Sequence, residues 1–302
     1  MISWIYVKAK AGYCLKWYFH VPHLMDLAKI GIPLIVIGLI YTVLLSVDRI
    51  MIIKMIGAKE LGFYSIAILA FTYTNTFPKL FGIVLFPSMQ EELGKTESVT
   101  GILHYVKKPV FMMAHVFPFA LAAAYFIIPI LVGYVLPRYT AGLVSMRILL
   151  IGCFFISLAG FAQNLVIARN RQVLLIPFIL LALIAGVGMN YILVKRGFGI
   201  EGIAMGTSIA YLIYFLCIFL YVLIHAKDHK NILKFFAQTC LPLVYASLLI
   251  LCLEFFICFD FLILKNSVQM GIFAICYFPV LVYVQKKTDI LAHIKKMFRI
   301  NA

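Results

Sequence analysis

A polar stripe interrupts an apolar stretch near residue 75. Its members occupy positions i, i+3, i+4 and i+7, and are Thr72, Asn75, Thr76 and Lys79. This spacing places all four side chains on one face of a helix. An ammonium group at the centre of a bilayer costs about 2.5–3.5 kcal/mol even on a lenient insertion scale. Lys79 is therefore expected to face protein or water, either in a functional cavity or along a hydrogen-bonded seam between helices.

A second stripe precedes residue 50. Thr42, Ser46 and Arg49 follow at i, i+4 and i+7, so a cation again ends a row of hydroxyl groups. Asp48 stands beside the arginine. The two charged residues are either functional groups of a membrane helix or a simple interfacial ion pair.

Two further stretches carry polar groups that an apolar core does not need. Arg147 lies near one end of a stretch that carries Gln163 and Asn164 near its other end. Glu254 is the only carboxylate deep in an apolar run. Ionisable residues inside membrane segments are functional candidates by default, although a neutral, hydrogen-bonded acid explains Glu254 equally well.

The composition predicts a bilayer as the surrounding solvent. Of the 302 residues, 65% are hydrophobic and 12% are charged, with a mean hydropathy of +1.07. Soluble domains contain about 25% charged residues. Eight apolar stretches are long enough to cross a membrane as helices; they are 30–52, 62–86, 109–136, 142–166, 173–194, 198–225, 236–258 and 268–285. The predicted fold is an all-α, polytopic transmembrane helical bundle.

The positive residues predict the orientation of this bundle. The formal net charge is +15, and one side of the predicted membrane carries roughly twice as many lysines and arginines as the other. This bias places both termini in the cytoplasm and accounts for the basic charge, so no nucleic-acid partner is expected. The predicted organisation is a cytoplasmic or interfacial N-terminal segment (1–29), a six-helix unit (30–225), two additional helices (226–285) and a basic cytoplasmic tail (286–302).

Sequence patterns for catalysis and metal binding are missing. The seven cysteines include no Cys-x-x-Cys pair, and no cluster of histidine and acidic residues has metal-ligand spacing. Phosphate-binding loops of the G-x-x-x-x-G-K-[ST] type and G-x-S-x-G nucleophile motifs are absent. We therefore expect no catalytic residues, no metal and no cofactor, and a protein that is not an enzyme.

Four segments carry a resemblance to a known family. The first runs from Ile30 to Ala67; the others are VGYVLPRYTAGLVSMRILLIG, NLVIARNRQ and GFGIEGIAMGTSIAYLI. Within the first segment the resemblance rests on Pro33, Asp48, Arg49, Gly57, Leu61, Gly62, Tyr64, Ser65 and Ala67. In this order, the segments resemble the second lobe of Wzx-like polysaccharide (O-antigen) flippases of the multidrug/oligosaccharidyl-lipid/polysaccharide exporter superfamily.

The resemblance implies a transport function in the bacterial inner membrane. Such proteins move undecaprenyl-diphosphate-linked oligosaccharides across that membrane for surface polysaccharide biosynthesis. It implies that Arg49, Lys79 and Arg147 supply cations for the diphosphate, and that Asp48 or Glu254 couples transport to an ion gradient. The remaining polar groups would line the cavity; they are Thr42, Ser46, Thr72, Asn75, Thr76, Gln163 and Asn164.

The same resemblance covers only one lobe of two. It implies a half-length or truncated flippase whose partners are a lipid-linked oligosaccharide, membrane lipids, a second lobe (a second copy or a separate polypeptide) and a polysaccharide polymerase. Two alternatives remain open: a polytopic enzyme of glycan assembly, such as a polymerase or acyltransferase, and a non-transporting membrane partner of a glycan assembly complex. The sequence specifies neither the glycan nor the coupling ion.

Overall fold

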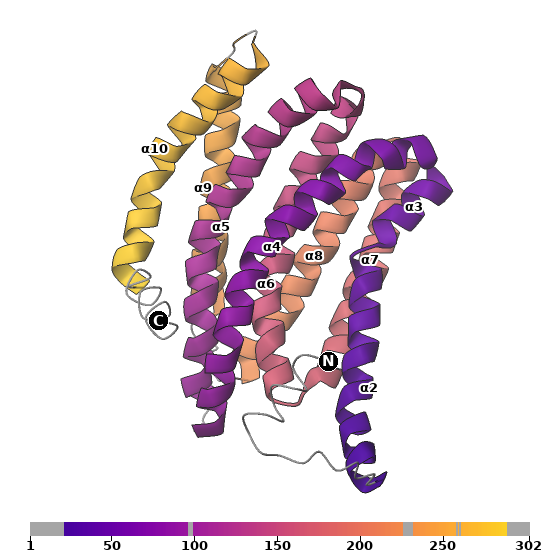
Figure 1. The fold of residues 1–302 in the computed structure, drawn as a ribbon, viewed down its shortest axis with the longest axis vertical. Helices are drawn as coiled ribbons and strands as arrows, with labels where there is room; N and C mark the ends of the chain where they lie inside the picture. Colours follow the sequence, from indigo (N-terminus) through magenta and orange to yellow (C-terminus); the bar gives the residue numbers. More distant parts are fainter. Residues whose placement is uncertain (1–20, 96–98, 226–231, 258, 260, 289–302) are drawn as a thin grey trace, which may run out of the picture.

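The computed structural model describes residues 21–95, 99–225, 232–257, 259 and 261–288 (Figure 1). In these ranges the chain forms nine α-helices and two short 3₁₀ helices, and no described residue lies in a strand. The α-helices are α2 (Val21–Leu44), α3 (Val47–Met55), α4 (Ala58–Lys95), α5 (Val99–Val135), α6 (Leu143–Ala168), α7 (Leu175–Lys195), α8 (Gly199–His225), α9 (Ile232–Phe256) and α10 (Leu262–Thr288). The 3₁₀ helices are η1 (Pro137–Gly142) and η2 (Gln172–Leu174). The expected all-α helical bundle is confirmed.

Seven helices in the described ranges are long and apolar enough to cross a membrane. They are α2, α5, α6 to α10, and they make the chain a multi-pass membrane protein. The exception among the predicted spans is α4, in which the polar stripe lowers the hydropathy. Figure 1 shows that α4 nevertheless runs through the middle of the bundle beside α6.

The first predicted helix, 30–52, is wrong as a single element, because the structure divides it at Leu45 and Ser46 into α2 and α3. At the break the N–H of Ser46 donates to Val43, three residues back, and the N–H of Arg49 donates to Ser46. Asp48 supplies a further acceptor, since its carboxylate takes the N–H of Arg49 at 2.8 Å. Side chains that bond nearby backbone groups in this way offer the chain an alternative to a continuous helix.

The second and third helices are longer than predicted. Most of the interval 87–108, expected as a loop, is helical, because α4 continues to Lys95 and α5 begins at Val99. With 38 residues, α4 is about 57 Å long, well beyond the roughly 30 Å of a hydrocarbon core. Hydropathy marks where the apolar stretch ends, whereas backbone hydrogen bonding decides where the helix ends. Of the predicted terminal segments, residues 1–20 and 289–302 lie outside the described ranges, and α2 already begins at Val21.

Two hydrophobic cores hold the helices together. The larger core joins α4, α6, α7 and α8, and also takes in α2, α3, one side of α5 and the N-terminal half of α9. The smaller core joins α5, α10 and the C-terminal half of α9 through Phe126, Leu253, Phe273 and Tyr277. Helix α9 therefore contributes to both cores, one with each half.

Small residues allow α7 and α8 to pack closely. Gly206 of α8 faces Asn190 of α7, and a Cβ atom at position 206 would overlap the Asn190 side chain. Gly186 of α7 likewise faces Ala210 of α8, and its Cβ atom would lie 2.8 Å from that of Ala210. In α8, Gly202, Gly206 and Ala210 recur every four residues, a spacing that lets a neighbouring helix approach closely.

We expect Gly206→Ala to destabilise the protein, because the added methyl group must push α7 away from α8. Overpacking of this kind typically costs about 1–3 kcal/mol. Thermal unfolding in detergent should show a lower Tm than for the wild-type protein. Gly188→Ala is the matched control on α7, since its Cβ atom would meet nothing within 4 Å. Equal Tm values for the two variants would contradict the described packing.

Candidate functional site

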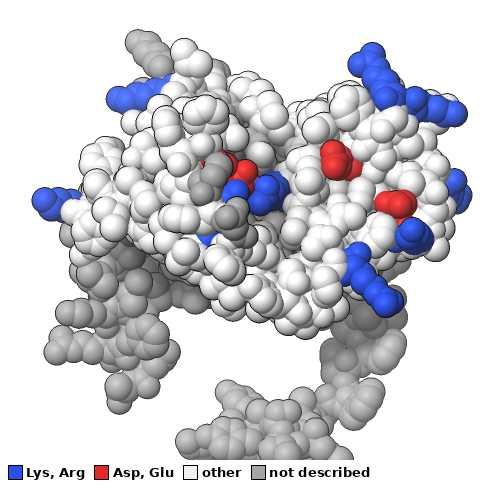
Figure 2. All heavy atoms as spheres, turned by 90° about the horizontal axis from the view of Figure 1, so that it is seen from above, with Lys and Arg blue, Asp and Glu red and all other residues white. Residues whose placement is uncertain are grey.

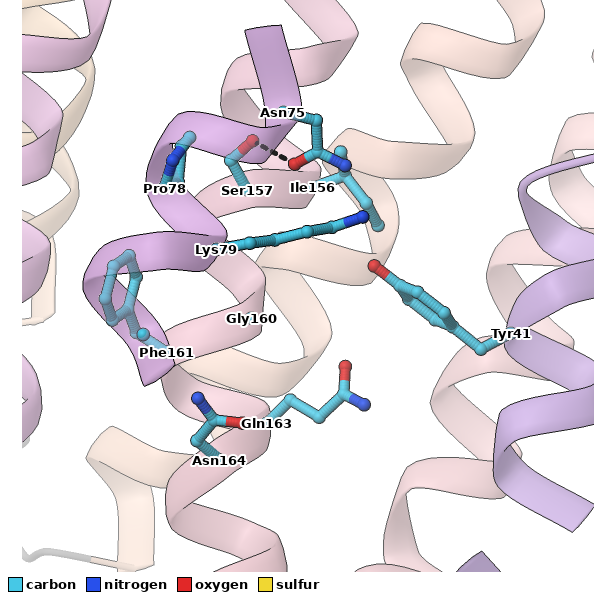
Figure 3. Close-up of a pocket in the computed structure, with 11 residues that line it drawn as sticks. Tyr41, Asn75, Pro78, Lys79, Ile156, Ser157, Gly160, Phe161, Gln163 and Asn164 are labelled. Carbon is cyan, nitrogen blue, oxygen red and sulfur yellow. Dashed lines mark hydrogen bonds between the residues drawn. The ribbon is translucent and has the colours of Figure 1, made fainter. Parts of the chain in front are cut away.

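A cavity of about 500 Å³ lies between α4, α6 and α2 (Figure 3). Helix α4 contributes Asn75, Pro78, Lys79 and Gly82 to its wall, and α2 contributes Tyr41. The residues from α6 are Ile156, Ser157, Gly160, Phe161, Gln163 and Asn164. The structure thus brings together four of the predicted site residues, Asn75, Lys79, Gln163 and Asn164, although they come from two helices far apart in sequence.

Lys79 is the cation of this cavity. Its side chain is exposed and extends across the cavity toward Tyr41 of α2 (Figure 3). Within the described residues, no carboxylate oxygen lies within 4.0 Å of its ammonium group, and the ion pair of the described residues joins Arg147 and Glu254. An ammonium group with three donors and no acidic partner provides a place for an anion.

Asn75 is fixed in the wall by α6. Its side-chain oxygen accepts a hydrogen bond of 2.8 Å from the hydroxyl of Ser157, and both residues are buried. Since a buried amide without partners is costly, this contact orients Asn75. The remaining donor, its amide nitrogen, can serve a ligand or a neighbouring group.

The two amides of α6 occupy the part of the cavity nearer the C-terminal end of that helix (Figure 3). The oxygen of Gln163 accepts a hydrogen bond of 3.1 Å from the hydroxyl of Tyr214 in α8. Asn164 lies close to Gly82 of α4. Amide groups donate and accept hydrogen bonds, which suits the hydroxyl groups of a sugar.

The predicted threonines do not line this cavity. Thr42 donates its hydroxyl hydrogen bond to Gly38, Thr72 to Ile68, and Thr76 to Thr72, in each case to a carbonyl of its own helix. All three are exposed. Each hydroxyl group has its hydrogen-bond partner within its own helix, and the members of the α4 stripe that line the cavity are Asn75 and Lys79.

Ser46, Asp48 and Arg49 lie at the break between α2 and α3, away from the cavity. Ser46 is half-buried and Arg49 is exposed, whereas Asp48 is only 3% exposed. In the described part of the chain, no lysine or arginine nitrogen lies within 4.0 Å of the Asp48 carboxylate, which accepts a hydrogen bond from the N–H of Arg49. Tyr64 of α4 and Tyr211 of α8 are close enough to interact with it electrostatically.

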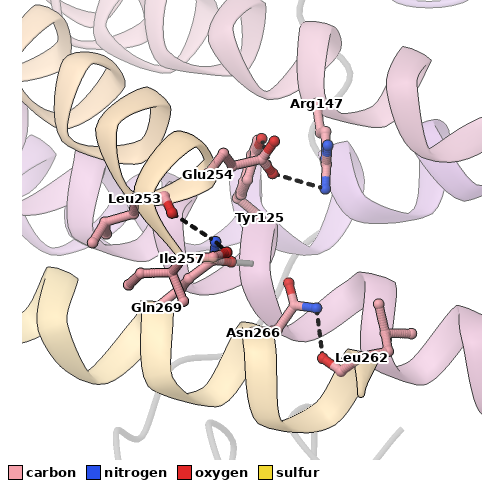
Figure 4. A network of polar contacts seen from close by, with 8 residues as sticks. All are labelled: Tyr125, Arg147, Leu253, Glu254, Ile257, Leu262, Asn266 and Gln269. Carbon is pink, nitrogen blue, oxygen red and sulfur yellow. Dashed lines mark hydrogen bonds and ion pairs between the residues drawn. The ribbon is translucent and has the colours of Figure 1, made fainter. Parts of the chain in front are cut away.

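Arg147 and Glu254 meet in a separate network, at the end of the bundle where α6 begins and α9 ends (Figure 4). Nη2 of Arg147 lies 3.2 Å from Oε1 of Glu254. The same carboxylate oxygen accepts a hydrogen bond of 2.9 Å from Tyr125 of α5, and the guanidinium group stacks 4.5 Å from the centre of the Tyr125 ring. Figure 2, seen from this end, shows acidic and basic side chains next to each other in a hollow.

The three cations predicted for one diphosphate therefore occupy three places. Lys79 lies in the cavity, Arg49 is exposed on α3, and Arg147 is paired with Glu254. Linear spacing carries no information on how α3, α4 and α6 face one another.

Several residues of both sites escaped the sequence analysis. Tyr41 and Tyr125 give no sequence signal, because tyrosines are common in membrane helices. Ser157 and Gly160 were detectable, since they precede the predicted Asn164 by seven and four positions and share its face of α6. No group of three or more His, Cys, Asp or Glu side chains within the described residues is arranged to hold a metal ion.

Comparison with known proteins gives one match. Residues 1–135 match the family described as polysaccharide biosynthesis protein. This range includes α2 to α5, and hence Asp48, Arg49, the polar stripe of α4 and Tyr125. No curated protein and no solved structure matches the chain. The match supports a role in polysaccharide biosynthesis for a multi-pass membrane protein.

Proposed function

We propose that this chain carries a lipid-linked oligosaccharide, an undecaprenyl-diphosphate glycan, across the bacterial inner membrane for surface polysaccharide biosynthesis. The observation that carries the proposal is Lys79, a cation with no acidic partner among the described residues, in a cavity lined by the amides of Asn75, Gln163 and Asn164. A diphosphate needs cationic partners when it leaves water, and sugar hydroxyls need hydrogen-bonding groups. The partial match to the polysaccharide biosynthesis family supports the same substrate class.

In this proposal the three cations act in succession. Lys79 receives the diphosphate in the cavity, and Arg49 and Arg147, near the opposite end of the bundle from the α6–α7 connection, receive it later (Figure 1). Asp48 couples the movement to an ion gradient. We further propose a carrier that performs no covalent step, has both termini in the cytoplasm, and works with a second lobe, either a second copy or a separate polypeptide, and with a polysaccharide polymerase.

Deletion of the gene in its native bacterium tests the proposal. Surface polysaccharide and lipid-linked oligosaccharide on the inner leaflet are quantified together. Loss of surface glycan with accumulation of complete, inward-facing lipid-linked units is the expected result. Accumulation of incomplete or unpolymerised units would instead indicate an enzyme of glycan assembly, and unchanged surface glycan would overturn the proposed role.

Gly160→Leu should block the cavity without disturbing the fold. A Cβ atom at Gly160 meets nothing within 4 Å, so a leucine there can extend into the cavity beside Lys79. In the deletion strain, this variant is expected to restore less than about a tenth of wild-type export, which corresponds to the loss of roughly 1.4 kcal/mol of substrate binding. Gly188→Leu, on a face of α7 that is equally open and outside the cavity, is expected to restore export fully. Full export by both variants would contradict the assignment of the cavity as the substrate site.

A further inference from the structure

The pairing of Arg147 with Glu254 leaves much of the guanidinium group unused. One nitrogen, Nη2, contacts the carboxylate at 3.2 Å. Nε is buried and has no hydrogen-bond partner among the described residues. A guanidinium group has five N–H donors and prefers two parallel bonds to an anion, as phosphates and carboxylates both allow. Arg147 therefore keeps donors that its single contact with Glu254 does not use.

The pair also bridges a gap between two helices. A cavity of about 210 Å³ lies between α5, α6 and α9, with Leu150 of α6 and Leu243 and Ile250 of α9 in its wall. Arg147 lies at this cavity too, and both members of the pair are about one third exposed, at 32% and 31%. Across the gap, the C-terminal half of α9 is joined to α6 by a polar contact rather than by close packing.

Helix α9 is built to bend between its two halves. Phe235, in the N-terminal half, packs against Phe219 of α8 with ring centres 5.2 Å apart, as part of the larger core. Leu253, in the C-terminal half, belongs to the smaller core. Between them lies Pro242, which cannot donate the helical hydrogen bond to the carbonyl of Gln238. The missing bond makes Pro242 a natural hinge.

Helix α10 is attached to the half of α9 that carries Glu254. The side-chain nitrogen of Gln269, a residue only 1% exposed, donates to the carbonyl of Leu253 at 3.0 Å (Figure 4). The hydroxyl of Tyr245 donates to the carbonyl of Cys276 at 3.1 Å. A movement of the C-terminal half of α9 would therefore involve α10, and both helices would shift against α5, with which they share the smaller core.

We propose that Glu254 acts as an internal counter-ion that occupies an anion site on Arg147, and that a phosphate-class anion displaces it. Displacement breaks the contact between the C-terminal half of α9 and α6, and this half, together with α10, then shifts along α5 and away from α6 about Pro242. The Arg147–Glu254 pair is thus a latch that an anionic group opens. The identity of the natural anion rests on the proposed diphosphate substrate, whereas the latch itself does not.

The test measures the distance between α6 and α9 in the purified full chain in lipid nanodiscs. Nitroxide labels are placed at Val144→Cys and Phe255→Cys, both exposed positions close to the pair in sequence, with the seven native cysteines replaced by alanine. Double electron–electron resonance spectroscopy then gives the distribution of distances between the two labels. We expect Glu254→Gln to raise the population of a longer-distance state about tenfold, as the loss of a charge-assisted contact predicts. Inorganic pyrophosphate should produce the same shift in the wild-type protein, and none in Arg147→Gln.

Two further variants make the result decisive. Glu201→Gln, a neutralised carboxylate at the start of α8 near the same end of the bundle, is the matched control and should keep the wild-type distribution and the response to pyrophosphate. The double variant that exchanges the two residues, Arg147→Glu with Glu254→Arg, retains an ion pair and should restore the short distance. It tests the latch even if Glu254→Gln does not fold. The latch is overturned if Glu254→Gln has the same distance distribution as the wild-type protein. It is also overturned if the exchange variant shows the same long distance as Arg147→Gln.

The outcome with pyrophosphate stands apart from the export experiment. If pyrophosphate does not change the distance distribution of the wild-type protein, anions do not displace Glu254 and that part of the proposal is overturned. Distances in the purified chain do not depend on transport, so this result leaves the export proposal intact. Conversely, unchanged surface glycan in the deletion strain overturns the export proposal and leaves the measured latch in place.

Discussion

Lys79→Ala is expected to reduce glycan export at least about tenfold while leaving membrane insertion and protein level unchanged. The lysine supplies the positive charge of the cavity, and a charge-assisted hydrogen bond to an anion is worth about 1.5–3 kcal/mol. The side chain is exposed and takes part in no described ion pair, so its removal leaves no acidic group unpaired. Surface polysaccharide in the complemented deletion strain is the measurement, with the membrane content of the variant determined in the same cells.

Two controls separate charge from shape. Lys79→Arg keeps the positive charge and should retain most of the export. Lys54→Ala removes an exposed lysine of α3 that lies outside the cavity, and should leave export at the wild-type level. Normal export by well-expressed Lys79→Ala would remove Lys79 from the proposed substrate site.

Asp48→Asn is expected to abolish the dependence of transport on an ion gradient. A buried carboxylate costs several kcal/mol when ionised, and no cationic nitrogen of the described residues lies within 4.0 Å of Asp48, so a bound proton or a bound cation stabilises it there. Asparagine has the size of the protonated acid but cannot release a proton or exchange a cation. Transport in proteoliposomes with imposed proton or sodium gradients should therefore fall to the rate measured without a gradient.

The matched control for Asp48→Asn is Glu60→Gln, in the first turn of the neighbouring helix α4, where the side chain is only half-buried. This variant should respond to the gradient like the wild-type protein. Pyrophosphate binding to Asp48→Asn should be unchanged, because Asp48 lies outside the cavity of Lys79. A gradient response that persists in Asp48→Asn would exclude this carboxylate as the coupling group.

Long hydrophobic stretches predicted most of the helices, because the need to satisfy every backbone group in lipid leaves the chain little choice. The same signal failed at Ser46, where a local exchange of hydrogen bonds within an apolar stretch ends one helix and begins another. It also failed beyond residue 86, where α4 continues after the apolar residues end. Helix boundaries depend on hydrogen bonds that hydropathy does not measure.

For the candidate site, periodicity placed Asn75 and Lys79 on one face of a helix, and Gln163 and Asn164 were predicted only as polar groups near the end of another. Periodicity could not show that these two groups meet, since that depends on how α4 packs against α6. The pairing of Arg147 with Glu254 was equally out of reach, because the two residues are more than a hundred positions apart in the sequence. Contacts of this kind come from tertiary packing and leave no trace in local spacing.

The packing of α2 on α7 has a consequence for biogenesis. Helix α2 contacts α7 and η2, and α3 contacts α7 and α8, whereas the ribosome completes α4, α5 and α6 before α7. Helix α2 is therefore inserted before α7 has been synthesised, and the face that later contacts α7 is exposed to lipid until then. During this interval Asp48 lacks the surroundings that later bury it. Insertion of α7 and α8 is thus the step at which α2 and α3 gain their later partners in the bundle.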